Sequence, residues 1–258
     1  MSADTNRRGW LKAAAASLGG VWLTACDKFT TNPKTLKIVS SAEGLTRRVQ
    51  RAVIDRKALA REFKPTEISS DFKSNGTHQP PDDDYIALQA KGFADYRLVV
   101  DGLVERPLSL SLAELRALPS RTQITRHDCV EGWSCIGKWT GARLGPLLDQ
   151  AGLKKNARYI VLHCADTLEQ TLDGSGQYYE SIDLIDAYHP QTILAYAMND
   201  APLAVPYGAP LRLRVERQLG YKHAKYVMRV EAVADYSQIG RGQGGFWEDR
   251  GYEWYAGI

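Results

Sequence analysis

Short β-strand patterns recur along residues 96–233, with only brief helical segments between them. The strand patterns fall at 96–100, 108–110, 121–128, 158–164, 193–198, 211–216 and 225–233. The helical patterns at 112–118, 141–151 and 182–188 do not alternate with the strands in a β-α-β rhythm. The chain is therefore predicted to form a mixed, β-rich α+β domain with short helices.

Two of the helices have boundary signals. Ser111 and Glu114 form a capping-box pattern at the start of 112–118. Apolar residues recur at helical spacing through 141–151, and Gly152 follows as a left-handed cap.

The first 26 residues read as an export signal. Arg7 and Arg8 match the twin-arginine pattern, and the apolar stretch after them is too short to span a bilayer. The stretch ends in Leu-Thr-Ala-Cys, a lipobox-like sequence, which predicts cleavage before Cys26 and a lipid anchor on its sulfur. A twin-arginine signal cut nearby, with Cys26 incidental, is the alternative. Both alternatives predict a periplasmic protein. Twin-arginine export carries folded proteins, which bacteria commonly need when a cofactor is inserted in the cytoplasm, so the signal is a hint of a cofactor.

The chain is predicted to contain four regions. They are a signal peptide at 1–25, an N-terminal extension at 26–74, a main domain at 75–236, and a tail rich in glycine and aromatic residues at 237–258. Within the extension and the start of the domain, 46–62 has helical spacing and 75–81 reads as a loop. The net charge of +3 and the absence of any basic run argue against nucleic-acid binding.

Residues 125–140 place a cysteine close to a histidine, two carboxylates and two tryptophans, the highest concentration of reactive side chains in the chain. Cys129 falls where a predicted strand ends and a loop begins, a place where a side chain can meet a ligand. One thiolate suits a soft or high-valent metal whose other ligands come from a cofactor. Arg212, with Lys225 thirteen residues later, offers the cations that an anionic cofactor needs.

Two alternatives for these cysteines remain open. A Cys129–Cys135 disulfide has a permissible spacing, although three cysteines besides Cys26 make an odd set. A zinc site can also be drawn from His127, His163 and the same two cysteines, but its spacing matches no known zinc motif.

Three segments in order resemble a known family. They are H-D-C-V-E-G-W-S at 127–134, Y-G-A-P-L-R-L at 207–213 and G-Y-K-H-A-K-Y at 220–226. They are similar to the molybdopterin-binding domain of the sulfite oxidase family, most closely its Tat-exported bacterial branch, which includes the catalytic subunit of the periplasmic methionine sulfoxide reductase. The resemblance covers about 75–234.

The resemblance implies a site and a fold of the sulfite oxidase type. It makes Cys129 the thiolate that binds molybdenum and the catalytic residue. It assigns contacts with the molybdenum-molybdopterin cofactor to Asn75, His78, Cys164, Tyr207, Arg212, His223, Ala224 and Lys225. His78, Cys164 and Tyr207 differ from the residues of the family at their positions, which leaves the fold expectation intact and puts the substrate in doubt.

The implied reaction is two-electron oxygen-atom transfer on a small-molecule or protein sulfoxide, with sulfite dehydrogenation as the alternative within the family. Electrons would pass to or from a membrane cytochrome b subunit or a periplasmic cytochrome c. The aromatic tail would cover the pocket, meet that partner or simply close the core. A hypothesis from another functional class also remains open. In it the protein is a cofactor-free lipoprotein that uses the same fold for binding, with a disulfide between Cys129 and Cys135.

Overall fold

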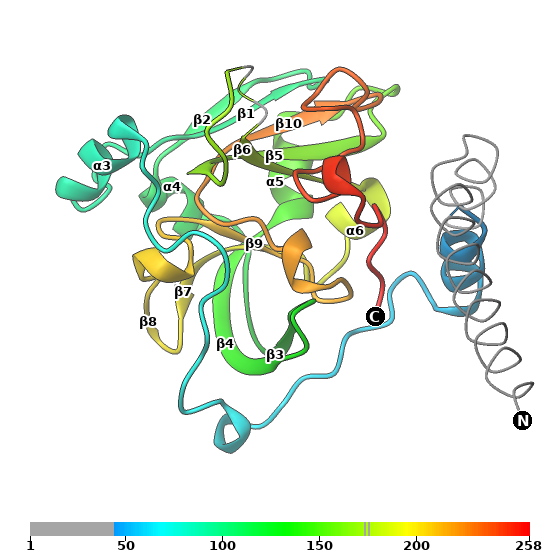
Figure 1. The fold of residues 1–258 in the computed structure, drawn as a ribbon, viewed down its shortest axis with the longest axis horizontal. Coiled ribbons are helices and arrows are strands. Elements are labelled where there is room, and N and C mark those ends of the chain that lie inside the picture. The colour runs from blue at the N-terminus through cyan, green and yellow to red at the C-terminus, as the bar shows by residue number, and fades with distance from the viewer. Residues whose placement is uncertain (1–43, 173, 175) are drawn as a thin grey trace, which may run out of the picture. The chain divides into compact units, whose positions relative to one another are not determined.

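The computed structural model describes residues 44–172, 174 and 176–258 (Figure 1). The chain divides into two compact units, with the boundary after Val53. In the first unit the described residues, 44–53, are helical. The predicted export signal, with Arg7, Arg8 and Cys26, lies outside the described residues. Within the described residues, no helix combines the length and the apolar character needed to cross a bilayer.

The second unit contains two β-sheets. The first has the order β2-β1-β10-β5-β6, with β1 and β10 parallel and the other pairs antiparallel. Its strands are β1 (Leu98–Gly102), β2 (Leu108–Leu110), β5 (Tyr159–Thr167), β6 (Gln177–Asp183) and β10 (Val227–Val233). They lie in the upper half of Figure 1.

The second sheet has the order β3-β4-β7-β8, and β9 pairs with β7. Its strands are β3 (Ser120–Asp128), β4 (Ser134–Arg143), β7 (Ile193–Met198), β8 (Ala201–Pro202) and β9 (Arg212–Arg214). All of its pairs are antiparallel, and the hairpin of β3 and β4 forms the long curved ribbon at the bottom of Figure 1. Cys129 lies in the loop of this hairpin.

Short helices connect the strands. The α-helices are α3 (Asp83–Ala90), α4 (Leu112–Ala117), α5 (Leu144–Ala151) and α6 (Leu184–Ala187), and the 3-10 helices are η1 (Pro65–Glu67), η2 (Val205–Tyr207), η3 (Gly220–Lys222) and η4 (Glu248–Arg250). The predicted capping box of Ser111 and Glu114 is present at α4, and Gly152 ends α5 with φ 72°.

The main apolar core joins both sheets through α5. Leu144, Leu147 and Leu148 of α5 are fully buried in one cluster with Val100 of the first sheet and Leu194 of the second. At about 25 cal/mol for each Å² of apolar surface removed from water, side chains of this size stabilise the fold by roughly 1.5–3 kcal/mol each. The core therefore holds α5 and β7, which pairs with β4, against the first sheet.

The α+β prediction is confirmed, and three local expectations were wrong or incomplete. Residues 141–143 belong to β4 and not to the following helix, because Ala142 pairs with Leu194 of β7 and Gly141 lets the strands approach. A Cβ at Gly141 would lie 2.3 Å from the Leu194 carbonyl oxygen. Of the segment 46–62 only residues up to 53 are helical.

The helix predicted from 182 begins at Leu184, since Ile182 and Asp183 belong to β6. Neither β6 nor α3 was predicted. In β6, five successive residues are buried, including polar Glu180 and Ser181, so the apolar alternation that marks a strand is missing.

Candidate functional site

Cys129 lies directly after β3 in a tight turn. Its N–H donates to the Trp133 carbonyl at 2.9 Å, and its own carbonyl accepts from the Gly132 N–H at 3.1 Å. Gly132 has φ 83°, which a residue with a side chain rarely adopts. Cys129 is 9% exposed, and burial raises the pKa of its thiol, so a positive centre is needed to hold it as a thiolate.

Cys129 lines a pocket of about 720 Å³ of empty space, part of it open to solvent. The pocket is built from six stretches: the 75–77 loop, the turn after β3, the end of β5, the start of β6, the η3 loop with the residues after it, and the C-terminal tail. Its lining includes Asn75, Cys129, Glu131, Asp166, Tyr178, Tyr221, His223, Lys225, Trp247 and Tyr252.

Three buried cations, Arg212, Arg214 and Lys225, lie behind and beside this pocket. We call them the cationic cluster. Arg212 and Arg214 come from β9, and both guanidinium groups lie over the Trp139 ring, at 5.2 and 4.4 Å from its centroid. Both arginines are at most 2% exposed.

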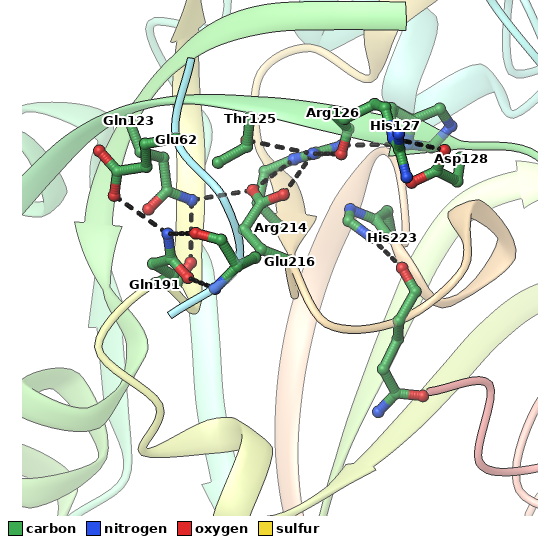
Figure 2. A network of polar contacts seen from close by, with 12 residues as sticks. Glu62, Gln123, Thr125, Arg126, His127, Asp128, Gln191, Arg214, Glu216 and His223 are labelled. Atoms are coloured by element: carbon green, nitrogen blue, oxygen red, sulfur yellow. Dashed lines mark hydrogen bonds and ion pairs between the residues drawn. The ribbon is translucent and has the colours of Figure 1, made fainter. Parts of the chain in front are cut away.

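Arg214 is the one cation of the cluster with a full ion pair. It donates to both carboxylate oxygens of Glu216, at 2.9 and 2.6 Å. Gln123 donates to the same carboxylate at 2.8 Å and to the Gln191 carbonyl at 2.9 Å. Figure 2 shows this network ending at His127, whose Nδ1 lies 3.0 Å from Arg214 Nη1.

Because a guanidinium only donates, His127 Nδ1 accepts from Arg214 and the ring proton is on Nε2. That Nε2–H is buried and has no hydrogen-bond partner among the residues that the structure describes. Burial, with Arg214 and Arg212 nearby, lowers the pKa of His127 well below its usual value. His127 is therefore a neutral imidazole in a fixed tautomer.

The Arg212 guanidinium does not use all of its hydrogen-bond donors within the described residues. Its Nη1 donates to the Tyr207 carbonyl at 3.1 Å and its Nη2 to the His223 carbonyl at 3.4 Å, while the buried Nε has no partner within the described part of the chain. Burial and the adjacent Arg214 lower the pKa of Arg212 to about 9. The guanidinium is thus desolvated without a carboxylate of its own.

Lys225 fixes the loop that precedes α3. Its ammonium donates to the carbonyls of Asn75 at 2.7 Å, Thr77 at 2.5 Å and Pro206 at 2.9 Å. These bonds use its three hydrogens. Burial and Arg212 lower the pKa of Lys225 to about 7, and Asp166 acts in the other direction.

His223 and Asp166 face the pocket with unpaired atoms. His223 Nε2 lies 3.0 Å from the Gln218 carbonyl, so it carries the proton, and the buried Nδ1 has no partner. Asp166 is 3% exposed and its Oδ1 has no partner. Burial raises the pKa of Asp166 to about 6, although Lys225 opposes the shift.

The structure brings Asn75, Cys129, His223 and Lys225 together in the pocket lining, and Arg212 lies directly behind His223. Four other candidates lie apart from the pocket lining. His78 is exposed, Cys164 and Ala224 are buried in the core, and the Tyr207 hydroxyl donates to the Phe72 carbonyl at 2.9 Å.

Sequence reasoning did not select Asp166, Tyr178, Tyr221, Trp247 or Tyr252 as site residues. Asp166 lies two residues beyond Cys164 on the same strand, and that spacing was its only signal. Tyr178 and Tyr221 lie on β6 and η3, whereas Trp247 and Tyr252 join the pocket because the tail packs against the η3 loop.

All three described cysteines, Cys129, Cys135 and Cys164, are free thiols, so the alternative of a Cys129–Cys135 disulfide is not formed. Cys135 lies on β4, with its thiol 3.8 Å from the Asp71 carbonyl. In the part of the chain that the structure describes, no group of three or more His, Cys, Asp or Glu side chains could hold a metal. His163 pairs with Glu231 in the first sheet and not with His127, which removes the zinc alternative.

The residues present fit an anionic cofactor with one protein thiolate. Three cations face two carboxylates, Glu216 and Asp166, and only Arg214 is fully paired. The Arg212 Nε and the His223 Nδ1 are buried without partners, as expected of atoms that serve a ligand. A Cβ at Gly220 would lie 2.6 Å from the His127 ring, so a glycine is required for the η3 loop to approach β3.

This fold and site define a molybdopterin-dependent oxidoreductase. Residues 86–239 match the model of the family described as oxidoreductase molybdopterin binding domain. The chain belongs to this family, as the sulfite-oxidase-type motifs predict.

Several relatives are similar over part or most of the chain. A protein named as the protein-methionine-sulfoxide reductase subunit YedZ1 of Azospira oryzae is 35% identical over 97% of this chain and 87% of its own length. The protein-methionine-sulfoxide reductase catalytic subunits MsrP of Xanthomonas axonopodis pv. citri and Campylobacter jejuni are 36% and 30% identical, over 57% and 53% of this chain. The chain spans about half the length of these two subunits.

Among solved structures, the sulfane dehydrogenase SoxCD of Paracoccus pantotrophus is similar. It has a TM-score of 0.49 and 24% identity, and the match covers 55% of this chain and 39% of the SoxCD chain.

Proposed function

We propose that the protein is an exported, periplasmic molybdopterin enzyme that reduces sulfoxides, with electrons supplied by a separate haem protein. The observation that carries this proposal is the desolvated cationic cluster beside Cys129, with its unpaired donor on Arg212 and unpaired acceptor on His223. The names of the YedZ1 and MsrP relatives support the sulfoxide as substrate.

Four residues would hold the cofactor. Cys129 would supply the thiolate ligand, Arg212 its free donor, and His223 a hydrogen-bond acceptor. Lys225 would contribute its charge while its hydrogens hold the 75–77 loop in place. When bound, the molybdenum centre supplies two-electron oxygen-atom transfer.

Reduction of a sulfoxide consumes two electrons and two protons and gives a thioether and water. Asp166 is the pocket residue suited to deliver a proton near neutral pH, since its pKa is raised to about 6. His127 stays neutral and fixes the end of β3 through Arg214, so that the turn carrying Cys129 is rigid.

Sulfite dehydrogenation fits this pocket less well. The Glu131 carboxyl group in the lining would disfavour a sulfite dianion. The hydrogens of Lys225 are already donated to carbonyl groups.

Sequence features support the remaining parts of the proposal. The twin-arginine pattern at Arg7 and Arg8 supports export, and the lipobox-like Cys26 supports an anchor on the membrane. The electron donor would be a membrane cytochrome b subunit or a periplasmic cytochrome c.

The test is a substrate panel with protein purified from a Tat-competent, molybdenum-supplied host. With reduced viologen as donor, we expect turnover of methionine sulfoxide, and with a ferric cytochrome c as acceptor we expect little oxidation of sulfite. Molybdenum-loaded protein that oxidises sulfite and reduces no sulfoxide would reverse the assignment.

A further inference from the structure

The C-terminal tail forms one side of the pocket. The family model ends at residue 239, and the tail beyond it is the red segment in Figure 1. Trp247 and Tyr252 of this tail line the pocket together with Cys129. Tyr252 is 39% exposed, so this side is open to solvent.

The aromatic rings of the tail continue into the η3 loop. The Trp247 and Tyr252 ring centroids are 5.2 Å apart, and Tyr252 meets Tyr221 edge-on at 5.2 Å. Phe246 stacks on Tyr178 at 5.6 Å. Together Tyr178, Tyr221, Trp247 and Tyr252 form what we call the aromatic wall.

A buried ionic group holds this wall in place. Lys222 of η3 donates to Glu180 of β6 and to Glu248 of the tail, both at 2.5 Å, and all three side chains are at most 1% exposed. We call these three residues the tail lock. Arg250 adds a bond to Glu169 at 3.0 Å, and the Tyr221 hydroxyl donates to the Glu253 carbonyl at 2.6 Å.

The lock joins the wall to the loop that carries His223, so the wall has a fixed position relative to the site. A tail that only closed the core would not need to present Trp247 and Tyr252 to the pocket. A wall of aromatic faces near carboxyl groups suits a neutral molecule with an apolar substituent, because apolar surface gains from burial and sulfur contacts aromatic rings favourably.

We propose that Trp247 and Tyr252 form a specificity wall that contacts the apolar substituent of an organic sulfoxide, so that aryl and long alkyl sulfoxides bind better than dimethyl sulfoxide. The inference rests on the proposed sulfoxide reduction and names the substrate class of that site. The tail thereby gives this chain a selectivity that its family domain, residues 86–239, does not contain.

The test compares Trp247→Ala with wild type, using methyl p-tolyl sulfoxide and dimethyl sulfoxide. The KM for the aryl sulfoxide should rise about tenfold, the change expected when a ring contact is lost from a binding pocket. The KM for dimethyl sulfoxide should change less than about threefold, and kcat should stay within a few-fold for both. Reduced viologen as donor makes the assay independent of any haem partner.

Calorimetry without an electron donor gives a second readout, because the sulfoxide then binds without being reduced. The Kd for the aryl sulfoxide should rise by the same factor as the KM, with molybdenum content unchanged. Trp254→Phe is the matched control: this tail tryptophan packs on Tyr159 and is not part of the pocket lining. Its KM ratio between the two sulfoxides should equal that of the wild type.

Equal effects on both sulfoxides, or no effect on either Kd, would overturn the specificity wall. A second result would also overturn it: Trp247→Ala slows turnover with a cytochrome donor but leaves both Kd values unchanged. The tail would then be a contact for the electron donor. Molybdenum-loaded wild type that reduces neither sulfoxide contradicts the proposed function itself, which separates the two failures.

Discussion

Two buried charged groups lie close to the pocket, and they differ in how their charges are balanced. In the tail lock, one ammonium meets two carboxylates, and burial together with Glu248 raises the pKa of Glu180 well above its usual value, so that a proton balances the charge. In the cationic cluster, Arg212 has no carboxylate partner and its Nε is unpaired. Among the described residues, Glu180 Oε2 and Glu248 Oε2 are also buried without a hydrogen-bond partner. The two groups therefore differ in charge: the tail lock is balanced within the protein, whereas the cationic cluster lacks an anion for Arg212.

Buried charges that stabilise the fold thus differ from buried charges that serve a ligand. A buried ion pair is costly to break because removal of one partner leaves an unpaired charge in a medium of low polarity. An unpaired buried cation carries that cost already, and it is retained where a ligand compensates it.

The largest effect is expected at the thiol that faces the cationic cluster. Cys129→Ser should lower sulfoxide reduction at least about 100-fold, because Cys129 is the proposed metal ligand and its loss should exceed the 10–100-fold effect of removing a ligand's hydrogen-bond partner. The measurement is viologen-linked turnover per chain. Cys135→Ser is the matched control, since this thiol packs beside Phe72 and Trp139 away from the pocket, and it should keep wild-type turnover. Equal losses in both variants would contradict the role of Cys129.

The second effect concerns Arg212. Arg212→Met should lower the molybdenum content of purified protein about tenfold or more, because the charge-assisted hydrogen bond proposed between Arg212 and the cofactor would be lost. The apo-protein should be as stable as wild type or more stable, since a desolvated guanidinium without a carboxylate is gone. Elemental analysis and urea unfolding measure the two quantities.

Arg229→Met is the control for Arg212. This arginine is on the first sheet, bonded to Asp101 and Glu231, and its side chain is 36% exposed. Its replacement should leave molybdenum content unchanged. An Arg212 variant that retains the cofactor and loses stability would make the cationic cluster structural, like the tail lock.

The third effect concerns the tail lock. Lys222→Met should lower the free energy of unfolding by about 3–5 kcal/mol, the usual cost of leaving buried carboxylates without their cation. Urea unfolding of the apo-protein gives this value. Lys91→Met, which removes an exposed pair with Asp95, should leave the unfolding midpoint unchanged. A lock variant that unfolds like wild type would show that Lys222 is not needed to fasten the tail.

The smallest effect is a change in pH dependence. The pKa of Asp166 is raised from 3.8 to about 6, so the folded apo-protein binds more protons at this group than the unfolded chain between pH 4 and pH 6. Its contribution to stability is present below pH 4 and is lost as the pH rises through 6. Asp166→Asn should therefore gain about 1–3 kcal/mol relative to wild type over this range.

Urea unfolding of both proteins from pH 4.5 to 7.5 measures this gain. A difference between them that stays constant with pH would exclude a raised pKa of Asp166. Glu180→Gln should show a gain of the same sign, because the pKa of Glu180 is raised by burial as well.

Site residues could be predicted from the sequence where several of them lie in one short segment. The segment 127–134 and the loop 220–226 have a specific order of residue types, so Cys129, His223 and Lys225 could be placed in one site before the structure was known. The capping box of α4 and the glycine that ends α5 depend on neighbouring residues only, and both were predicted.

The other parts of the site depend on contacts between distant segments. Asp166 becomes a pocket residue only because β5 ends beside Lys225, and Trp247 only because Lys222 binds Glu248 across the η3 loop. β6 was missed for the same reason: Glu180 is buried by its contact with Lys222, so its strand has no polar face. Local patterns cannot contain these pairings.

The most direct test is the cofactor content of the wild-type protein, purified in folded form from a Tat-competent host. Molybdenum and oxidised pterin are measured per chain on the same sample. We predict about one molybdenum and one pterin for each chain, held beside Cys129 by the cationic cluster. Folded protein that contains neither, from a host that loads other molybdenum enzymes, would contradict this prediction and leave the cofactor-free binding protein as the better description.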